Sequence, residues 1–200
     1  MLTMTVKSGG GTGDYTPGWK KVTVKSAAYG THEQSRFIDM WFEEYGDNFN
    51  ARIWEKKDKE GNEFAIANLF RFANAGIETV QANGSANSKV VQINDKAENL
   101  HTKQIWIYLY KNEEGYARVL QRIAPVEFTN ELDTIDDSSV TYWKTKAEQY
   151  FTDWVEPNIA KSSGGGGDFI TASLDEVKDK MEDRSTTTGN STDVFSGMPE

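Results

Sequence analysis

Three aromatic residues occupy every second position of one short segment of the chain: Trp106, Tyr108 and Tyr110. Because successive side chains of a β-strand point to opposite faces, these three rings share one face of a predicted strand. The residues between them are aliphatic and form the expected core face of that strand. When aromatic rings and arginine side chains share one surface of a sheet, the rings can stack on unpaired bases and the guanidinium groups can neutralise phosphates. The chemistry that this spacing predicts is therefore non-covalent binding of a single nucleic-acid strand.

Four further segments alternate an aliphatic face with a ring-bearing or charged face. They are the predicted strands near 19–25, 36–43 and 49–56, and the strand that follows the turn at 112–115. The non-aliphatic faces of the five strands carry the aromatic residues Trp19, Phe37, Trp41, Trp54, Trp106, Tyr108, Tyr110 and Tyr116, the cations Lys21, Lys25, Arg52, Lys56, Arg118 and Arg122, and the single acid Asp39. This excess of rings and cations over acids favours an anionic ligand that contains bases.

The residues predicted to bind single-stranded DNA fall into two groups. The rings expected to stack on bases are Trp41, Trp54, Trp106, Tyr108 and Tyr110, and the side chains expected to neutralise phosphates are Lys21, Lys25, Arg52, Lys56, Arg118 and Arg122. Trp19 and Phe37 are instead expected to be covered by other parts of the chain. An alternative interpretation stays open, in which the ring face is a second core under the C-terminal helix. The interspersed cations favour binding, because a covering helix would have to bury or displace them.

The elements that position these residues are mainly strands. Residues 62–75 form a predicted helix, for which Asn62 is a good N-cap and Gly76 a good terminating residue. Residues 81–89 form a predicted loop. Five strands with a helix between the third and the fourth is the arrangement of the OB-fold, whose open face takes single-stranded nucleic acid. The predicted fold class is therefore mainly β: an OB-like five-stranded β-barrel with that helix, a C-terminal helix and a disordered acidic tail.

The C-terminal third of the chain is an acidic appendage. A second helix is predicted to begin at Ser138 or Ser139 and to end before Pro157, and it either packs on its own body or pairs with a second subunit in a homodimer. The predicted layout is a flexible N-terminal arm at 1–18, the OB-fold domain at 19–126, an acidic connection with the C-terminal helix at 127–161, and a Gly-rich linker with a disordered acidic tail at 162–200.

The overall charge of −9 is unevenly distributed along the chain. Residues 1–126 hold 16 Lys and Arg against 15 Asp and Glu, whereas 127–161 and 162–200 each hold 3 against 8. An acidic chain argues against a simple nucleic-acid binder. Because the acids gather in the C-terminal third while cations gather on strand faces, the composition still permits one.

Several classes of protein are disfavoured by composition. The chain has no cysteine, which excludes disulfides, zinc–thiolate sites and cysteine nucleophiles. His32 and His101 do not have the spacing of a metal-binding pair, and no Ser-His-acid set is indicated, so we expect neither an enzyme nor a cofactor. No apolar run approaches the length of a membrane span, and no signal-peptide core is present. We expect a protein that does not contact membranes and is made in a cytoplasm.

Three segments carry a resemblance to a known group of proteins. These are residues 18–22 (GWKKV), 36–42 (RFIDMWF) and 69–77 (LFRFANAGI). Together with the 104–123 hairpin and an acidic tail, they resemble small bacteriophage single-stranded DNA-binding proteins, including phage proteins long labelled as a domain of unknown function. The resemblance covers about residues 18–126 in the order of elements, and no single short signature defines the group.

The resemblance implies an OB-fold, no catalysis, and sequence-independent binding and protection of single-stranded DNA during phage replication or recombination in the host bacterial cytoplasm. It also implies that the acidic tail docks replication or recombination proteins, through Asp193 and Phe195 in this chain. Such tails typically end in acids and a terminal aromatic residue, whereas here five further residues follow Phe195.

A function of a different class also fits the composition. The chain could form a non-enzymatic β-barrel or β-sandwich that serves as a structural or protein-interaction module, for example in a virion. In that case the ring face is buried against a partner chain. The cations among the rings argue against a permanent dry interface.

Overall fold

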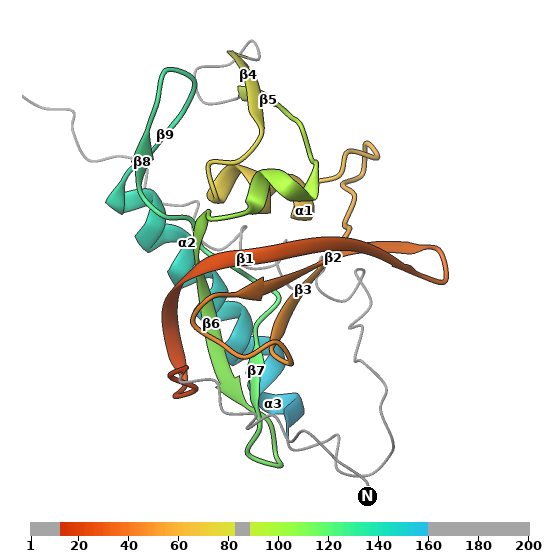
Figure 1. The fold of residues 1–200 in the computed structure, drawn as a ribbon, viewed down its shortest axis with the longest axis vertical. Helices are drawn as coiled ribbons and strands as arrows, with labels where there is room; N and C mark the ends of the chain where they lie inside the picture. The colour runs from red at the N-terminus through yellow and green to blue at the C-terminus, as the bar shows by residue number, and fades with distance from the viewer. Residues whose placement is uncertain (1–12, 83–88, 160–200) are drawn as a thin grey trace, which may run out of the picture. The chain divides into compact units, whose positions relative to one another are not determined.

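The main element of the molecule is a five-stranded antiparallel sheet in the order β3-β2-β1-β6-β7 (Figure 1). The strands are β1 (Gly18–His32), β2 (Ser35–Phe42), β3 (Asn50–Trp54), β6 (Gln104–Lys111) and β7 (Ala117–Val119). The computed structural model describes residues 13–82 and 89–159, all within the unit formed by residues 1–161. The prediction of a mainly β fold is confirmed.

The sheet is not closed into a barrel, so the predicted closure is wrong. The two edge strands β3 and β7 approach each other, but no backbone ladder joins them in the described part of the chain. The reason lies in the segment after β7, which keeps its hydrogen bonds to β6: Leu120 N donates to Tyr108 O at 2.9 Å, and Trp106 and Ala124 exchange bonds of 3.0 and 2.9 Å. Between the pairs Leu109–Val119 and Trp106–Ala124 the return strand has four residues against two in β6, so the regular ladder of β7 ends after three residues.

Strand β1 belongs to both halves of the sheet. Its first six residues pair with β6, from Gly18 opposite Leu109 to Thr23 opposite Gln104. Its later residues pair with β2, and the register shifts between Val24 and Ser26. A bulge of this kind bends a strand and increases its twist. The strand therefore extends to His32, past the predicted end near residue 25, and divides the sheet into a β6 half and a β2–β3 half.

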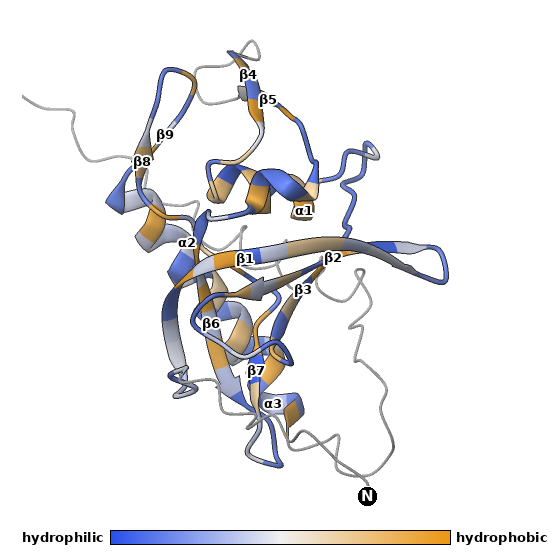
Figure 2. Ribbon diagram, viewed as in Figure 1, coloured by the Kyte–Doolittle hydropathy of each residue, from blue (hydrophilic) through white to orange (hydrophobic). Residues whose placement is uncertain are grey.

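The core lies on one side of this sheet and follows the predicted alternation. Fully buried strand residues are Val22, Val24, Ile38, Met40, Phe42, Ile105, Ile107 and Leu109. Helix α1 (Ala65–Phe72) buries Leu69 and Phe70 against the same core. Figure 2 shows the hydrophobic residues concentrated in these central strands and in α1. The core faces of the first four predicted strands were thus correctly identified, whereas in the strand after the 112–115 turn the predicted alternation fails beyond Val119, since Leu120 is buried and Gln121 is exposed.

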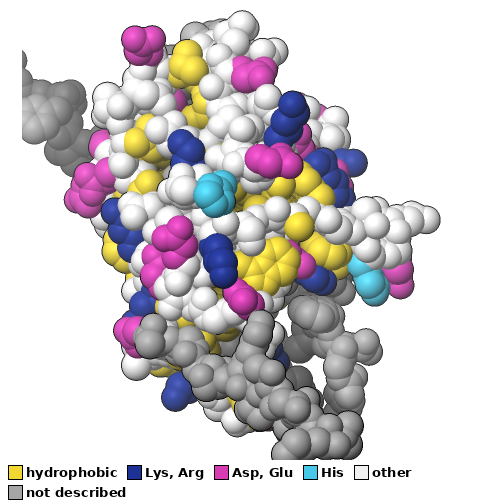
Figure 3. All heavy atoms as spheres, in the orientation of Figure 1, with side chains coloured by type: hydrophobic (Ala, Val, Ile, Leu, Met, Phe, Trp, Pro, Cys, Tyr) yellow, Lys and Arg dark blue, Asp and Glu magenta, His cyan; other side chains and the backbone are white. Residues whose placement is uncertain are grey.

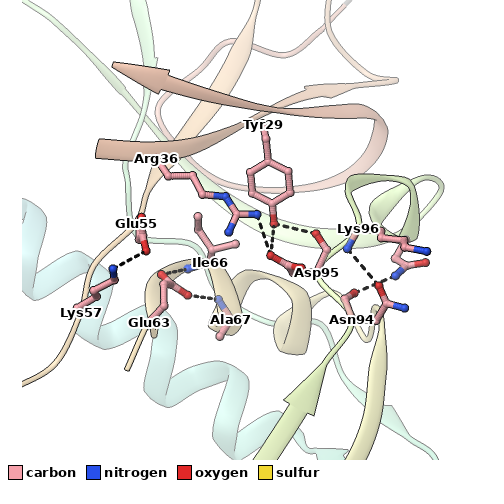
Figure 4. Close-up of polar contacts among 11 residues, drawn as sticks. Tyr29, Arg36, Glu55, Lys57, Glu63, Ile66, Ala67, Asn94, Asp95 and Lys96 are labelled. Atoms are coloured by element: carbon pink, nitrogen blue, oxygen red, sulfur yellow. Dashed lines mark hydrogen bonds and ion pairs between the residues drawn. The ribbon is translucent and has the colours of Figure 1, made fainter. Parts of the chain in front are cut away.

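Helix α1 begins at Ala65, three residues later than predicted. The side chain that accepts hydrogen bonds from its first turn is that of Glu63, and not that of Asn62. The carboxylate of Glu63 accepts hydrogen bonds from Ile66 N at 2.7 Å and from Ala67 N at 2.9 Å (Figure 4). Past the helix end, Gly76 has φ 63°, and a Cβ atom on it would lie 2.1 Å from the carbonyl oxygen of Asn94. Only glycine fits at this position.

Two small sheets supplement the main one. Strands β4 (Ile77–Ala82) and β5 (Lys89–Ile93) form a hairpin where a loop was predicted at 81–89; residues 83–88 lie outside the described residues. Strands β8 (Phe128–Thr129) and β9 (Thr134–Ile135) form the other, and a short 3₁₀ helix, η1 (Ala97–Leu100), precedes β6.

The C-terminal helix runs without a break for 23 residues. It consists of α2 (Asp137–Tyr150), a π-helical turn η2 (Phe151–Val155) and α3 (Glu156–Ile159), so Pro157 lies inside its last turn. The N-cap is Asp136, whose carboxylate accepts from Ser139 N at 2.8 Å. Most of its residues are hydrophilic (Figure 2). No helix in residues 13–82 or 89–159 is long and apolar enough to cross a membrane.

Candidate nucleic-acid interface

The side of the sheet opposite the core carries the predicted binding residues on two adjoining surfaces. We call the surface formed by Trp19, Trp106, Tyr108 and Tyr110 the β6 face. We call the surface formed by Phe37, Asp39, Trp41, Arg52 and Trp54 the β2–β3 face. Pairing in the two halves of the sheet brings each set together: Trp19 lies opposite Tyr108, and Phe37 lies opposite Trp54.

The C-terminal helix contacts the β6 face. The ring centroid of Phe151 lies 5.4 Å from that of Tyr108 and 5.5 Å from that of Tyr110. Burial raises the pKa of both tyrosines. Phe151 therefore occupies the position on these tyrosines where a base was expected to stack. This contact agrees with the alternative interpretation of the ring face as a second core.

Polar groups of the same helix hold the two tryptophans of the β6 face. Trp19 Nε1 donates a 2.6 Å hydrogen bond to Glu148 Oε1, and Lys144 Nζ lies 3.2 Å from the centre of the Trp106 ring. Burial lowers the pKa of Lys144, so this ammonium group is partly shielded from water. The helix thus supplies a ring, a cation and a hydrogen-bond acceptor to the face on which a nucleic-acid strand was predicted.

The β2–β3 face is organised around a bidentate ion pair. Arg52 donates from Nε to Asp39 Oδ1 at 2.8 Å and from Nη2 to Oδ2 at 2.7 Å, and the two residues are direct cross-strand partners. The guanidinium carbon also lies 3.7 Å from the centre of the Phe37 ring. These two hydrogen bonds fix the orientation of the guanidinium plane over the sheet. Arg52 is consequently a fixed, planar cation.

Two tryptophans flank this ion pair, one on each side along the strands. Trp54 packs edge-on against Phe37 at 4.9 Å and lies 6.3 Å from His32, whereas Trp41 makes no ring contact within the described residues. Both tryptophans are half-buried and keep part of their surface exposed. The β2–β3 face therefore presents two indole rings on either side of a fixed guanidinium group.

Phe37 is the covered ring of this face, as expected. It is 9% exposed, and its ring lies across the backbone of Gly30 on the neighbouring strand. A Cβ atom added to Gly30 would come 2.3 Å from the Phe37 ring. A residue without a side chain is therefore needed at position 30 to let Phe37 lie flat under Arg52.

The predicted phosphate-binding cations differ in their surroundings. Lys25 pairs with Asp47 at 2.8 Å, with both side chains exposed, and Lys21 is exposed opposite Trp106. Arg52 is held by Asp39, and the other three lie at the two sheet edges. Lys56 follows β3, Arg118 lies in β7, and Arg122 follows β7 with its guanidinium group 4.7 Å from the Tyr150 ring.

Some contacts of the charged residues were not predicted. Arg36 stacks on Tyr29 at 3.8 Å and pairs with Asp95 at 2.8 Å, and the Tyr29 hydroxyl donates to the Asp95 backbone oxygen at 2.8 Å (Figure 4). This cluster ties the β1–β2 hairpin to the segment before η1. On the face shown in Figure 3, basic and acidic side chains are interspersed, in keeping with such pairs. No sequence signal links Arg36 to Asp95, since only the fold brings them together.

Comparison with protein-family models and with curated protein sequences gives no match for this chain. The function is therefore inferred from the geometry of the two faces. The predicted partner-docking residues Asp193 and Phe195 lie outside the described residues, as does most of the predicted N-terminal arm.

Proposed function

We propose that this protein binds single-stranded DNA without sequence preference, and that the strand lies on the β2–β3 face. The observation that carries the proposal is the pair of partly exposed rings, Trp41 and Trp54, on either side of the fixed guanidinium group of Arg52. Every base has a π-face, so rings of this kind stack on bases irrespective of sequence. An arginine held between them adds cation–π contacts and a charge for the backbone.

The order of the strands supports this choice of face. Among the five strands of the main sheet, the second and third along the chain are β2 and β3, and α1 follows the third. In our proposal the sheet is an OB-fold whose edges β3 and β7 stay apart. OB-folds are partly open five-stranded barrels that bind oligonucleotides on the face of their second and third strands.

The proposed role is protection of single-stranded DNA in phage replication or recombination, in the host bacterial cytoplasm and without catalysis. The segment beyond residue 161 would dock replication or recombination proteins through Asp193 and Phe195. Its excess of acids keeps this segment from adding to the DNA-binding charge.

One observation favours a second candidate, a structural or protein-interaction module such as a virion component. The rings of the β6 face are already used for packing, with Phe151 on Tyr108 and Tyr110. In that case the exposed rings of Tyr116 and Tyr142, which are 63% and 55% exposed, would contact a partner protein.

Fluorescence anisotropy of a labelled oligo-dT tests the proposal. Trp54→Ala and Trp41→Ala should each weaken binding by about 1–3 kcal/mol, the range measured for a base stacked on one ring. Tyr142→Ala is the matched control, because it removes an exposed ring from the C-terminal helix and should leave the affinity unchanged. A chain that binds no oligo-dT, or one that loses affinity only with Tyr142→Ala, contradicts the proposal. The same assay with RNA and with duplex DNA measures whether the protein prefers single-stranded DNA over these two ligands.

A further inference from the structure

The arginines of the described chain divide into two groups by their partners. Arg36, Arg52 and Arg71 each pair with a carboxylate, at 2.8, 2.7 and 2.7 Å. Within residues 13–82 and 89–159, Arg118 and Arg122 have no such ion pair. Both belong to the same edge of the sheet, in β7 and just after it. The unpaired guanidinium groups are thus gathered in one place.

A lysine from the opposite sheet edge joins them. Lys56 is half-buried two residues after the end of β3, and in the described residues its ammonium group has no carboxylate partner. Burial, and secondly the nearby positive charge of Arg122, lower the pKa of Lys56. Where the unjoined edges β3 and β7 approach each other, cations from both sides therefore lie near one another.

A phenol ring lies beside each of the two arginines. Arg122 lies over the ring of Tyr150 at 4.7 Å, and Arg118 is the cross-strand partner of Tyr110. Both arginines thus have a neutral phenol ring beside them and, in the described residues, no carboxylate in an ion pair with them. Two like charges in partly dehydrated surroundings are unfavourable, and an anion placed between them would remove the repulsion.

We propose that Lys56 and Arg122 bind a phosphate group where the edges β3 and β7 approach each other, with Arg118 contacting the next phosphate along the strand. This inference rests on the proposed function, since it takes the phosphates to be those of the bound single strand. Lys56 follows Trp54 by two residues, so a strand whose base stacks on Trp54 would bring its backbone to Lys56. The strand then leaves the β2–β3 face across the sheet edge toward β7, and it does not run over the rings covered by Phe151.

The neighbouring lysine offers a matched control for the central residue. Lys57 carries the same charge one position further on, but it is exposed and pairs with Glu55 at 3.2 Å. Lys56→Met therefore removes a charge from a site without a carboxylate partner, and Lys57→Met removes the same charge from a site with one. Methionine keeps much of the apolar stem of lysine, which limits the loss of packing.

The first measurement is the melting temperature of the full chain in sodium phosphate and in sodium chloride at equal ionic strength. Phosphate should raise the melting temperature of the wild-type protein and of Lys57→Met, but not that of Lys56→Met or Arg122→Gln. Because a lysine with a lowered pKa in the folded state disfavours folding at neutral pH, Lys56→Met should melt no lower than the wild-type protein in chloride. A merely structural Lys56 would lower the melting temperature in both salts.

The second measurement is oligo-dT affinity as a function of salt. Lys56→Met should weaken binding several-fold and make the slope of log affinity against log salt shallower by about 0.7, the value for one phosphate contact on a single strand. Lys57→Met should leave the slope unchanged. Equal slopes for the two variants, with phosphate stabilisation retained in both, would overturn the phosphate site.

The proposed function and the phosphate site fail in different ways. If Trp54→Ala weakens oligo-dT binding and Lys56→Met does not, only the phosphate site is wrong. If phosphate stabilises the protein through Lys56 but oligo-dT does not bind, the proposed function is wrong and the cations hold a free phosphate ion.

Discussion

The indole N–H of Trp19 donates a 2.6 Å hydrogen bond to the carboxylate of Glu148, which lies 129 residues further along the chain. This bond joins the first strand of the sheet to the C-terminal helix. The same helix places Phe151 against the rings of β6. Of its first fourteen residues, the buried ones are Val140 and Ala147, so aromatic and polar contacts with the sheet contribute much of what holds it in place.

Replacing Trp106 with alanine should destabilise the protein without a selective loss of DNA binding. The ring is half-buried under the ammonium group of Lys144, and its removal leaves a gap between helix and sheet. The expected loss in free energy of unfolding is about 1–3 kcal/mol, below the range for a fully buried tryptophan. Urea denaturation measures this loss. A variant of unchanged stability with weakened oligo-dT binding would instead identify Trp106 as a base-stacking residue.

Replacing Gly30 with alanine should displace the Phe37 ring on the β2–β3 face. The added methyl group would lie 2.3 Å from the Phe37 ring, which supports the guanidinium group of Arg52. Overpacking of this kind costs about 1–3 kcal/mol, measured as a loss in free energy of unfolding. The double variant Gly30→Ala, Phe37→Leu has a smaller side chain at position 37 and should recover part of the stability. No recovery would mean that the methyl group clashes with the backbone and not with the ring.

The first turn of the C-terminal helix should lose stability in acid. Hydrogen bonds from Ser139, and then from Ser138, lower the pKa of Asp136 from 3.8 to about 2. A carboxyl group with a lowered pKa in the folded state stabilises that state above the unfolded pKa, and the effect is lost as the pH falls toward the folded pKa. Asp136→Asn keeps an oxygen acceptor but cannot titrate. The difference in urea stability between the two proteins should therefore shrink from pH 5 to pH 2; a constant difference would contradict this account.

The salt dependence of oligo-dT binding should report which cations contact the strand. Arg52, Lys56, Arg118 and Arg122 lie on the proposed path, which predicts a slope of log affinity against log salt of about −3, whereas all six predicted cations would give about −4. Lys25 already pairs with Asp47 at 2.8 Å, so Lys25→Gln should leave the slope unchanged. A slope near −4 that becomes shallower with Lys25→Gln would mean that the strand also contacts the cations of β1, which the proposed path avoids.

The core of the sheet was predictable because strand alternation is local. Ile105, Ile107 and Leu109 are each fully buried, as their period of two indicates. The extension of β1 to His32 was not predictable, since residues 26–32 (SAAYGTH) are small or polar and are held in the sheet by pairing with β2. The β4–β5 hairpin was missed although β4 (IETVQA) and β5 (KVVQI) are rich in β-branched residues, because the polar stretch at 81–89 indicated only a loop.

The distinction between ligand-facing and covered rings depends on tertiary structure. Trp106 lies between Ile105 and Ile107, and Trp54 follows Ile53 at the end of its strand, so both belong to the non-aliphatic face. What separates them is the C-terminal helix, which contacts Trp106 through Lys144. The sequence supports both interpretations of the rings, as a base-binding surface and as a second core. In the structure, the rings of the β6 face pack under the C-terminal helix, whereas Trp41 and Trp54 of the β2–β3 face stay partly exposed.

The sharing of β1 between the two halves has a consequence for the order of folding. Strands β1 and β2 are connected by only two residues, Glu33 and Gln34, so this hairpin can form within a short stretch of the chain. The pairing of Gly18 with Leu109 requires the whole intervening chain to be present and to have turned back. Because local contacts close sooner than distant ones, we expect the β2–β3 half to form first and the β6 half to assemble on the free end of β1 afterwards. During synthesis, the β2–β3 face would then be in place before the helix that covers the β6 face has been made.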